Sequence, residues 1–144
     1  MRILLAIDEP QSSAQTIERV VHQFRQEEAE VRVIHVLQPI SVSVPPQMAA
    51  GYAPELQDFS KQAKEMLEQT AKFLTDAGYK TDTLLRKGDI REEILNCARD
   101  WKADLIVMGS RGHGGKRLLL GSVAESVARQ AQCSVELVRA CNGN

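Results

Sequence analysis

The amino-acid sequence predicts a single α/β domain built on a parallel β-sheet with helices on both faces. Short apolar runs of strand length alternate along the chain with longer segments in which apolar residues recur every three or four positions. The first run, residues 3–7, is apolar at every position, which is typical of a strand covered on both faces. Such an alternation implies right-handed crossovers between parallel strands, and no internal repeat or shift of composition divides the 144 residues.

Five strands and four helices account for the chain outside its turns. The strands are expected at residues 3–7, 31–37, 81–85, 105–108 and 134–138. The first helix has Ser12 or Ser13 as its N-cap and an inner face made by Ile17, Val20, Val21 and Phe24.

The remaining helices follow the same reasoning. The longest runs from about Glu55 to Asp76 and is closed by Gly78. Its expected inner face consists of Leu56, Phe59, Ala63, Met66, Leu67, Thr70 and Leu74. Asp89 and Glu92 have the spacing of a capping box at the start of the third helix, and residues 123–130 form the fourth.

Residues 39–54 are expected to form a long irregular loop. This stretch holds Pro39, Pro45, Pro46 and Pro54, and proline interrupts regular structure. Loops of this length in compact domains are often functional lids, and a plain crossover connection is an equally good interpretation. Residues 140–144 are expected to form a flexible tail.

Composition excludes several classes of function. The formal net charge is −1, whereas a nucleic-acid-binding domain carries a basic excess. No apolar run reaches the roughly 18 residues of a membrane span, and the N-terminal run is too short for a signal peptide. The cysteines, Cys97, Cys133 and Cys141, are widely spaced, as expected of reduced thiols. We therefore expect a cytoplasmic protein whose partners include neither nucleic acid nor a membrane.

The most informative motif is a glycine-rich turn between the fourth strand and the fourth helix. Four of the nine glycines fall within residues 109–115, and Gly121 with Ser122 stands where the helix starts. Glycine lets backbone N–H groups approach an anion closely, and a helix N-terminus adds free donors and partial positive charge. The motif therefore indicates a phosphate-binding turn, with a tight structural turn as the alternative.

A carboxylate is expected to face this turn. In an open parallel sheet, ligands bind beyond the carboxyl ends of the strands, at the point where the strand order reverses. If the order is 3-2-1-4-5, that point lies between the first strand, which ends at Asp8, and the fourth, which ends at Gly109. Asp8 would accept a hydrogen bond from an amino or hydroxyl group of the ligand, or else simply cap its own turn.

These motifs resemble those of the universal stress protein family. The similar segments span the chain: residues 3–8, 33–36, 87–90, 103–109, 109–112 and 121–125. The resemblance implies a five-stranded, adenine nucleotide alpha hydrolase-like sheet of order 3-2-1-4-5 and a cytoplasmic homodimer paired through the fifth strand. In one branch of the family it also implies bound ATP.

The resemblance implies a nucleotide site made of four groups of residues. Asp8 and the backbone of Val36 would hold adenine, and Ala6 and Ile7 would line its slot. Ribose and phosphates would contact Met108, Gly109, Arg111 and Gly112. The triphosphate would be bound by Gly121, Ser122, Val123 and Ala124.

The chain departs from the family pattern at three places. Eight residues, not nine, separate Gly112 from Gly121, which removes up to about 3.5 Å of reach. Glu9-Pro10 stands where the family often has Gly-Ser. Glu136 puts a charge in the fifth strand, where an apolar residue is usual, and a carboxylate is costly in a buried interface.

The favoured function is a regulatory protein of the stress response that binds ATP or AMP, with Mg²⁺ assisting the phosphates and with little or no hydrolysis. No Walker lysine–threonine pair is present, and at most a very slow ATPase is expected. The alternative is a dimeric interaction module without nucleotide, which the shortened spacing favours. A phosphoacceptor domain is disfavoured, because the fifth strand ends Val138-Arg139 without the lysine such a site needs.

Overall fold

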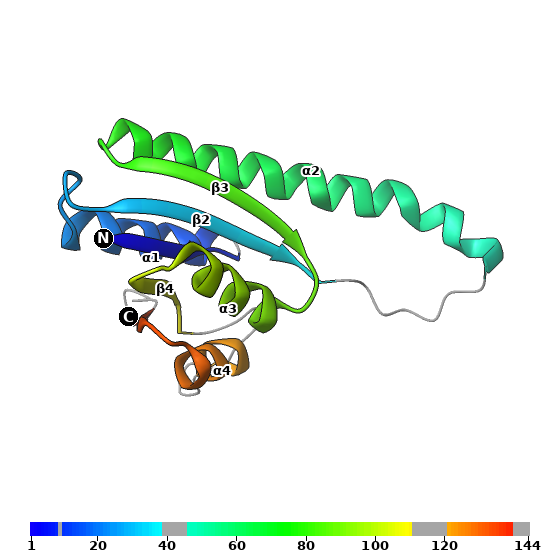
Figure 1. The fold of residues 1–144 in the computed structure, drawn as a ribbon. Coiled ribbons are helices and arrows are strands. Elements are labelled where there is room, and N and C mark those ends of the chain that lie inside the picture. The colour runs from blue at the N-terminus through cyan, green and yellow to red at the C-terminus, as the bar shows by residue number, and fades with distance from the viewer. Residues whose placement is uncertain (9, 39–45, 111–120, 140–144) are drawn as a thin grey trace, which may run out of the picture.

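The protein is described by a computed structural model (Figure 1). The backbone is described for residues 1–8, 10–38, 46–110 and 121–139, and the side chains for the same residues except 10–12 and 46–58. The expected tail at 140–144 and the first part of the expected loop, 39–45, lie outside the described residues.

A single five-stranded sheet forms the centre of the described chain. Its strands are β1 (Arg2–Ala6), β2 (Glu30–Leu37), β3 (Lys80–Lys87), β4 (Leu105–Gly109) and β5 (Ser134–Val138). Their order is β3-β2-β1-β4-β5, and every neighbouring pair is parallel. The predicted fold class and strand order are confirmed.

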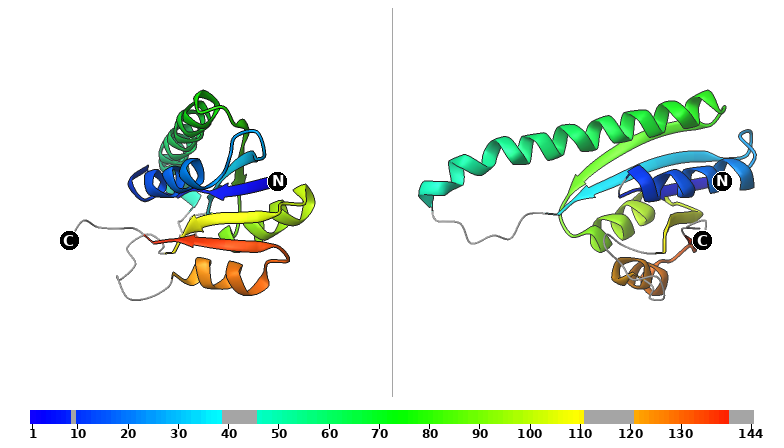
Figure 2. Two further views of the ribbon diagram at one scale, coloured as in Figure 1. Left: turned by 90° about the vertical axis from the view of Figure 1, so that its left-hand side faces the viewer. Right: turned by 180° about the vertical axis from the view of Figure 1, so that it is seen from behind.

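Helices cover both faces of this sheet (Figure 2). They are α1 (Pro10–Gln23), α2 (Pro46–Asp76), α3 (Ile90–Trp101) and α4 (Ser122–Gln130). Ile3 and Leu5 of β1 belong to a hydrophobic cluster with residues of α1 and α2, whereas Leu4 belongs to a second cluster with residues of α3 and α4. Because successive side chains of a strand point to opposite faces, this confirms that β1 is buried on both sides.

The start of α1 differs from the expectation. The helix begins at Pro10, so neither Ser12 nor Ser13 is its N-cap. Proline suits the first turn of a helix because its fixed φ is helical and its missing N–H has no partner there. Ser13 is instead buried, and its hydroxyl accepts a hydrogen bond from the backbone N–H of Asp8 at 3.2 Å.

The expected loop at 39–54 is helical in its second part. α2 begins at Pro46 rather than near Glu55 and runs through Pro54. Pro46 occupies the first position of the helix, where proline is well tolerated, and Pro54 removes one backbone hydrogen bond from its interior. As a result, the N-terminal part of α2 extends beyond the sheet (Figure 1).

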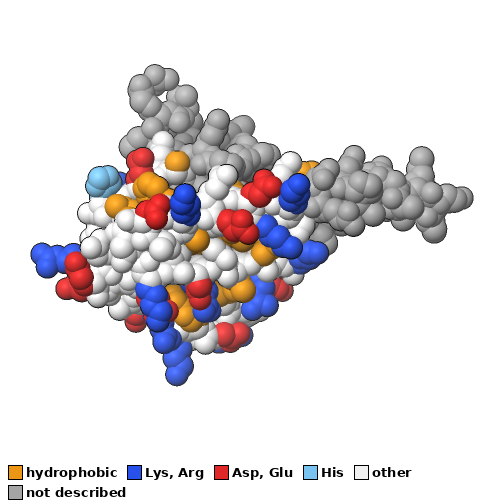
Figure 3. Space-filling view, turned by 90° about the horizontal axis from the view of Figure 1, so that it is seen from above, with side chains coloured by type: hydrophobic (Ala, Val, Ile, Leu, Met, Phe, Trp, Pro, Cys, Tyr) orange, Lys and Arg blue, Asp and Glu red, His pale blue; other side chains and the backbone are white. Residues whose placement is uncertain are grey.

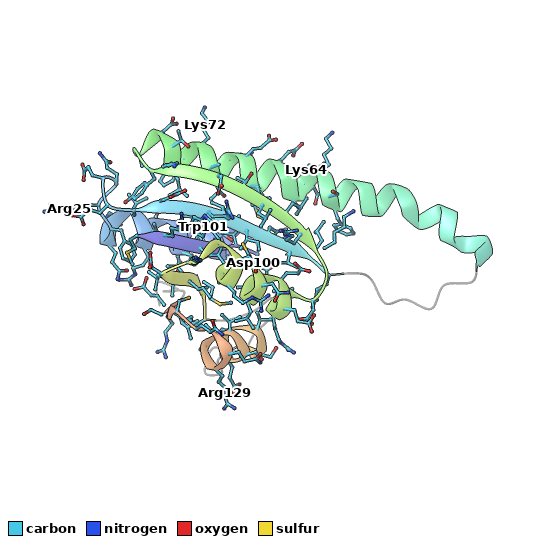
Figure 4. The ribbon with its side chains drawn as sticks, in the orientation of Figure 1. Arg25, Lys64, Lys72, Asp100, Trp101 and Arg129 are labelled. Carbon is cyan, nitrogen blue, oxygen red and sulfur yellow. The ribbon has the colours of Figure 1, made fainter. Side chains whose placement is uncertain are left out.

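The inner face of α2 is mostly as expected. Ala63, Leu67, Thr70 and Leu74 are buried, whereas Phe59, expected on the same face, is 52% exposed. Leu56 lies among the side chains that are not described. The face of the molecule seen in Figure 3 carries charges of both signs interspersed with apolar side chains. Lys72 of α2 and Arg129 of α4 point away from the sheet on opposite sides (Figure 4).

The ends of α3 are well defined. The Asp89 carboxylate accepts a hydrogen bond from the backbone N–H of Glu92 at 3.0 Å, which confirms the predicted cap. At the other end, Trp101 (Figure 4) lies under the guanidinium of Arg32, whose central carbon is 4.6 Å from the ring centroid. Arg32 also forms a two-bond fork with Asp82 of the neighbouring strand, with distances of 3.0 and 2.8 Å. These contacts fix α3 against β2 and β3.

β5 forms one edge of the sheet, next to β4. Val138 is buried in the cluster on the α1 and α2 side, and Val135 and Leu137 are partly buried against the α3 and α4 side. The apolar side chains of β5 are thus largely used within the chain. Glu136 has a buried Oε2 atom without a hydrogen-bond partner.

Across the part of the chain that the structure describes, we find no helix that combines the length and apolarity needed to cross a membrane.

Candidate functional site

A cleft lies at the carboxyl ends of the strands, toward which the arrowheads point in Figure 1. It has a volume of about 530 Å³, within the size range of small-molecule sites. Its floor comes from the ends of β1, β2 and β4, and α1, α3 and α4 supply its walls. β1 is flanked by β2 on one side and β4 on the other, so the cleft occupies the reversal point of the strand order.

Most residues proposed from the sequence line this one cleft. They are Ala6, Ile7, Asp8, Val36, Met108, Gly109, Ser122, Val123 and Ala124. Gly121 is not part of the lining, and Arg111 and Gly112 lie outside the described residues. Asp8 and Gly109, which end neighbouring strands, are thus brought to the same cleft, as the strand order implied.

Hydrogen bonds to α1 and β2 hold the β1 side of the cleft. The backbone N–H of Asp8 donates to Ser13 of α1. The Nδ1 atom of His35 lies 2.9 Å from the carbonyl oxygen of Ile7, so this nitrogen carries the proton and donates. The chain before and at Asp8 is therefore tied to both β2 and α1, which leaves the exposed Asp8 carboxylate at a defined place on the rim.

The two ends of the glycine-rich turn are joined to each other. The backbone N–H of Gly121 donates to the carbonyl oxygen of Ser110 at 2.7 Å, and Ser110 in turn donates to Val138 at 2.9 Å. Whatever path residues 111–120 take, the turn therefore leaves and re-enters the fold beside the carboxyl ends of β4 and β5.

The N-terminus of α4 opens onto the cleft. Gly121 is its N-cap residue, with φ −61°, and no side chain of the described residues caps the helix. Since Ser122, Val123 and Ala124 all line the cleft, the first turn of α4 presents its N–H groups and partial positive charge there. This arrangement is chemically suited to an anion.

Gly121 does not need glycine for its backbone conformation. The described glycines with positive φ are Gly78 and Gly88, and neither of them lines the cleft. Backbone strain is therefore not the reason for a glycine at the end of β4 or before α4.

The sequence indicated Val36 of β2 but neither His35 nor any residue of α3 as part of the cleft. His35, Gln38, Ile90, Arg91 and Ile94 line it in addition to the expected residues. The Arg91 guanidinium donates to the Ser122 hydroxyl at 3.3 Å, which connects the first turns of α3 and α4. The available signal was the position of residues 87–90, because a helix that starts after a neighbouring strand also begins at this end of a parallel sheet.

The described part of the chain holds no preformed metal-binding site. No group of three or more His, Cys, Asp or Glu residues is placed to hold an ion there. Chemically, the cleft offers a carboxylate on the α1 side and backbone donors with a guanidinium on the α3 and α4 side. It can bind a ligand with a hydrogen-bond donor at one end and negative charge at the other.

Comparison with known proteins identifies the family. The model of the universal stress protein family matches residues 1–139. Universal stress protein YxiE of Bacillus subtilis is 31% identical over 145 residues, which cover 96% of this chain and 98% of that protein. Universal stress protein MJ0531 of Methanocaldococcus jannaschii is 32% identical over 140 residues, covering 96% and 81%.

Solved structures agree in fold. The structure of MJ0577 from Methanocaldococcus jannaschii has a TM-score of 0.84 at 29% identity and covers 98% of this chain and 96% of that one. A universal stress protein in complex with cAMP scores 0.70 at 22% identity, covering 96% of both chains. The Arabidopsis thaliana protein At3g01520 with AMP bound scores 0.69 at 18% identity, covering 100% and 94%.

The strand order, the glycine-rich turn before α4 and the match over residues 1–139 agree with one another, and the chain belongs to the universal stress protein family.

Proposed function

We propose that this protein is an adenine-nucleotide-binding regulator of the stress response, with ATP or AMP as its ligand. The observation that carries the proposal is the cleft at the reversal point of the sheet, which has Asp8 on one side and the uncapped N-terminus of α4 on the other. The Asp8 carboxylate can accept a hydrogen bond from a base, and the N–H groups at the start of α4 can bind phosphate, so the cleft suits the two ends of a nucleotide.

The base would occupy the β1 and β2 side. The Asp8 carboxylate accepts a hydrogen bond from the exocyclic amino group of adenine, and the backbone of Val36 makes a second contact. Ala6 and Ile7 line the slot for the ring. A guanine base would present an oxo group to the carboxylate, which is repulsive, so this pairing favours adenine.

The ribose and phosphates would occupy the side of β4 and α4. Met108 and Gly109, with Arg111 and Gly112, contact the ribose and the nearer phosphates. Gly121, Ser122, Val123 and Ala124 receive the remaining phosphates at the start of α4. Since the described residues hold no carboxylate cluster, Mg²⁺ would be held by phosphate oxygens and water rather than by a protein cage.

The comparisons support an adenine nucleotide as the ligand. Two solved structures of similar fold contain cAMP and AMP, at 22% and 18% identity. Slow or absent hydrolysis fits the absence of a Walker lysine–threonine pair in the sequence. A cytoplasmic location fits the expectation that its three cysteines are reduced thiols.

We also propose a homodimer paired through β5. This strand is an edge of the sheet, so its outer N–H and C=O groups have no neighbouring strand among the described residues. Antiparallel pairing of two copies across a twofold axis satisfies these groups. The buried, unpartnered Oε2 of Glu136 would gain a partner if Arg139 of a second copy reached it.

A second candidate function is a dimeric interaction module of the same fold that binds no nucleotide. The eight-residue spacing between Gly112 and Gly121 favours it, because a shorter turn reaches less far around a triphosphate. The residues that would bind nucleotide in the cleft argue for the first candidate.

The deciding experiment measures the nucleotide that accompanies the protein. Protein purified without added ligand is denatured and its small molecules separated by chromatography, and calorimetry then titrates ATP, ADP and AMP with Mg²⁺. We expect bound adenine nucleotide or heat of binding at millimolar concentrations or below. No heat for any of the three would favour the interaction module.

An Asp8→Ala variant tests the mode of binding. It should lose affinity for ATP while its weak affinity for GTP is unchanged, so that adenine selectivity falls. Glu18→Ala is the control, because it also removes one exposed carboxylate of the same side of the sheet but does not line the cleft. Equal losses for both bases would assign Asp8 another role.

A further inference from the structure

The cleft contains a cation to which the proposed nucleotide site assigns no role. Among the described residues that line it, Arg91 is the one lysine or arginine. It stands in the first turn of α3, on the opposite wall from Asp8 and α1. The cleft is therefore electrostatically polar, with its carboxylate at one end and its guanidinium at the other.

Some of the described arginines have their charge paired with a carboxylate, and Arg91 is not one of them. Arg32, Arg99 and Arg129 each form an ion pair with a carboxylate, at 2.8, 3.5 and 2.8 Å. Arg91 has no such partner among the described residues, and its guanidinium donates instead to the neutral Ser122 hydroxyl at 3.3 Å. Its charge is thus not neutralised by a direct ion pair in that part of the structure.

The contact with Ser122 places this charge at the helix end proposed to bind phosphate. Ser122 is the first residue of α4, whose N-terminus has no side-chain cap. A guanidinium presents five N–H donors in a planar fork, so it can keep one hydrogen bond to the hydroxyl and direct others to a phosphate. Arg91 is exposed at the rim, and therefore free to adjust to a ligand.

We propose that Arg91 is a phosphate-binding residue of the nucleotide site, which acts from α3 together with the Ser122 hydroxyl and makes affinity depend on the charge of the phosphate chain. The inference rests on the proposed nucleotide function and adds a side chain from outside the glycine-rich turn. Arg91 belongs to α3, so its charge comes from outside the glycine-rich turn.

The test compares ligands that share a base and differ in phosphate charge. Calorimetry measures adenosine, AMP and ATP binding to the unmodified protein and to Arg91→Ala, Arg91→Lys and Arg99→Ala. Arg99→Ala is the matched control, because it removes the same charge from the same helix and Arg99 does not line the cleft. Thermal denaturation of each variant verifies that it is folded.

We expect Arg91→Ala to bind adenosine as the unmodified protein does and to bind ATP about ten-fold or more weakly, the loss of a hydrogen bond to a charged group. AMP should show a smaller loss than ATP. Arg91→Lys should recover part of the affinity, since it restores the charge without the fork. Raising the salt concentration should reduce the difference between Arg91→Ala and the unmodified protein.

Two results overturn this inference alone: unchanged ATP affinity in Arg91→Ala, or an equal loss for adenosine and ATP, which would mean a change in the shape of the cleft. A loss in Arg99→Ala as large as in Arg91→Ala would also overturn it, because the effect would then be one of general charge. If the unmodified protein binds none of the three ligands, the proposed function fails and the inference with it.

Discussion

The backbone N–H of Asp8 donates a hydrogen bond of 3.2 Å to the hydroxyl of Ser13, which joins the end of β1 to the first turn of α1. Ser13 is only 4% exposed, so its hydroxyl has little access to water as an alternative partner. The same hydrogen bond fixes the residue whose carboxylate we expect to recognise adenine. Stability and ligand binding should therefore both depend on it.

Ser13→Ala should lower the free energy of unfolding by about 1 kcal/mol, because the Asp8 N–H loses its partner. It should also weaken adenine nucleotide binding by releasing the turn. Urea denaturation and calorimetry measure the two effects. Ser60→Ala, the same change in α2, serves as the control and should alter neither. An unchanged urea midpoint in Ser13→Ala would show that the hydrogen bond contributes nothing.

Gly109→Val should abolish nucleotide binding and leave unfolding cooperative. Gly109 is the last residue of β4 and lines the cleft, and it is not among the described glycines with positive φ. Valine is therefore compatible with the strand, while its branched side chain would fill the space that a ligand approaches. Gly109→Ala should weaken binding less. Calorimetry that finds equal affinities in both variants and the unmodified protein would make this glycine purely structural.

Gly78→Ala should destabilise the protein at the end of α2. Gly78 has φ +99°, and a Cβ there would lie 2.6 Å from Oε1 of Gln26. A non-glycine residue at positive φ costs about 1–2 kcal/mol, and displacing the Gln26 side chain adds to this. Thermal denaturation of Gly78→Ala with and without Gln26→Ala separates the two contributions. Full stability in the single variant would contradict the prediction.

The β5 dimer predicts different effects at neighbouring positions. Leu137→Asp should dissociate the dimer, whereas Glu136→Lys should weaken it only modestly, because Glu136 points to the opposite face of the strand from Leu137. Light scattering at tens of micromolar measures both. Leu137 also packs in the core, so Leu95→Asp is needed as a control: Leu95 contacts the same cluster from α3 and should cost stability without dissociation. A monomeric unmodified chain would refute the arrangement.

Stability should decline in alkali through Cys97. Burial raises the pKa of this thiol above its usual 9.0, an effect that the nearby Arg32 partly offsets. The unfolded chain therefore ionises first, so the contribution of Cys97 is complete below about pH 9 and is lost as the pH rises toward the folded pKa. The stability difference between the unmodified protein and Cys97→Ala, from urea denaturation, should be smaller at pH 10 than at pH 8. Ile94→Val is the control, because Ile94 is buried and does not ionise, so its stability difference from the unmodified protein should be the same at pH 8 and pH 10. An equal difference at both pH values for Cys97→Ala as well would contradict the prediction.

Local sequence patterns determined the elements whose causes are themselves local. The apolar run of β1, the spacing in α1 and the pair Asp89 and Glu92 predicted a strand, an inner face and a cap that the structure confirms. These features depend on residues within one or two turns of each other, so their period along the chain is sufficient. Together with the alternation of strands and helices, they indicate a parallel sheet with a ligand cleft at its carboxyl edge.

Local rules were least reliable where they compete. Proline predicted a loop at residues 46–54, but this stretch is helical, and Pro46 stands at the first helical position, where proline is tolerated. Phe59 has the spacing of an inner residue and is exposed, because the period of a helix defines a face and does not say how far along the helix that face is covered. Ser13 looked like a cap and is a buried partner of Asp8 instead.

Only the tertiary structure decided which distant residues share the cleft. The sequence by itself identified Asp8 and the glycine-rich turn, because both directly follow strands that are recognisable from their apolar runs. Arg91 and His35 carry no comparable pattern, since their importance arises from contacts with Ser122 and Ile7, 31 and 28 positions away. Such contacts exist because neighbouring parallel strands end at one edge of the sheet and the helices packed on it start there. This geometry comes from the packing of the whole domain and leaves no periodic trace in the sequence around either residue.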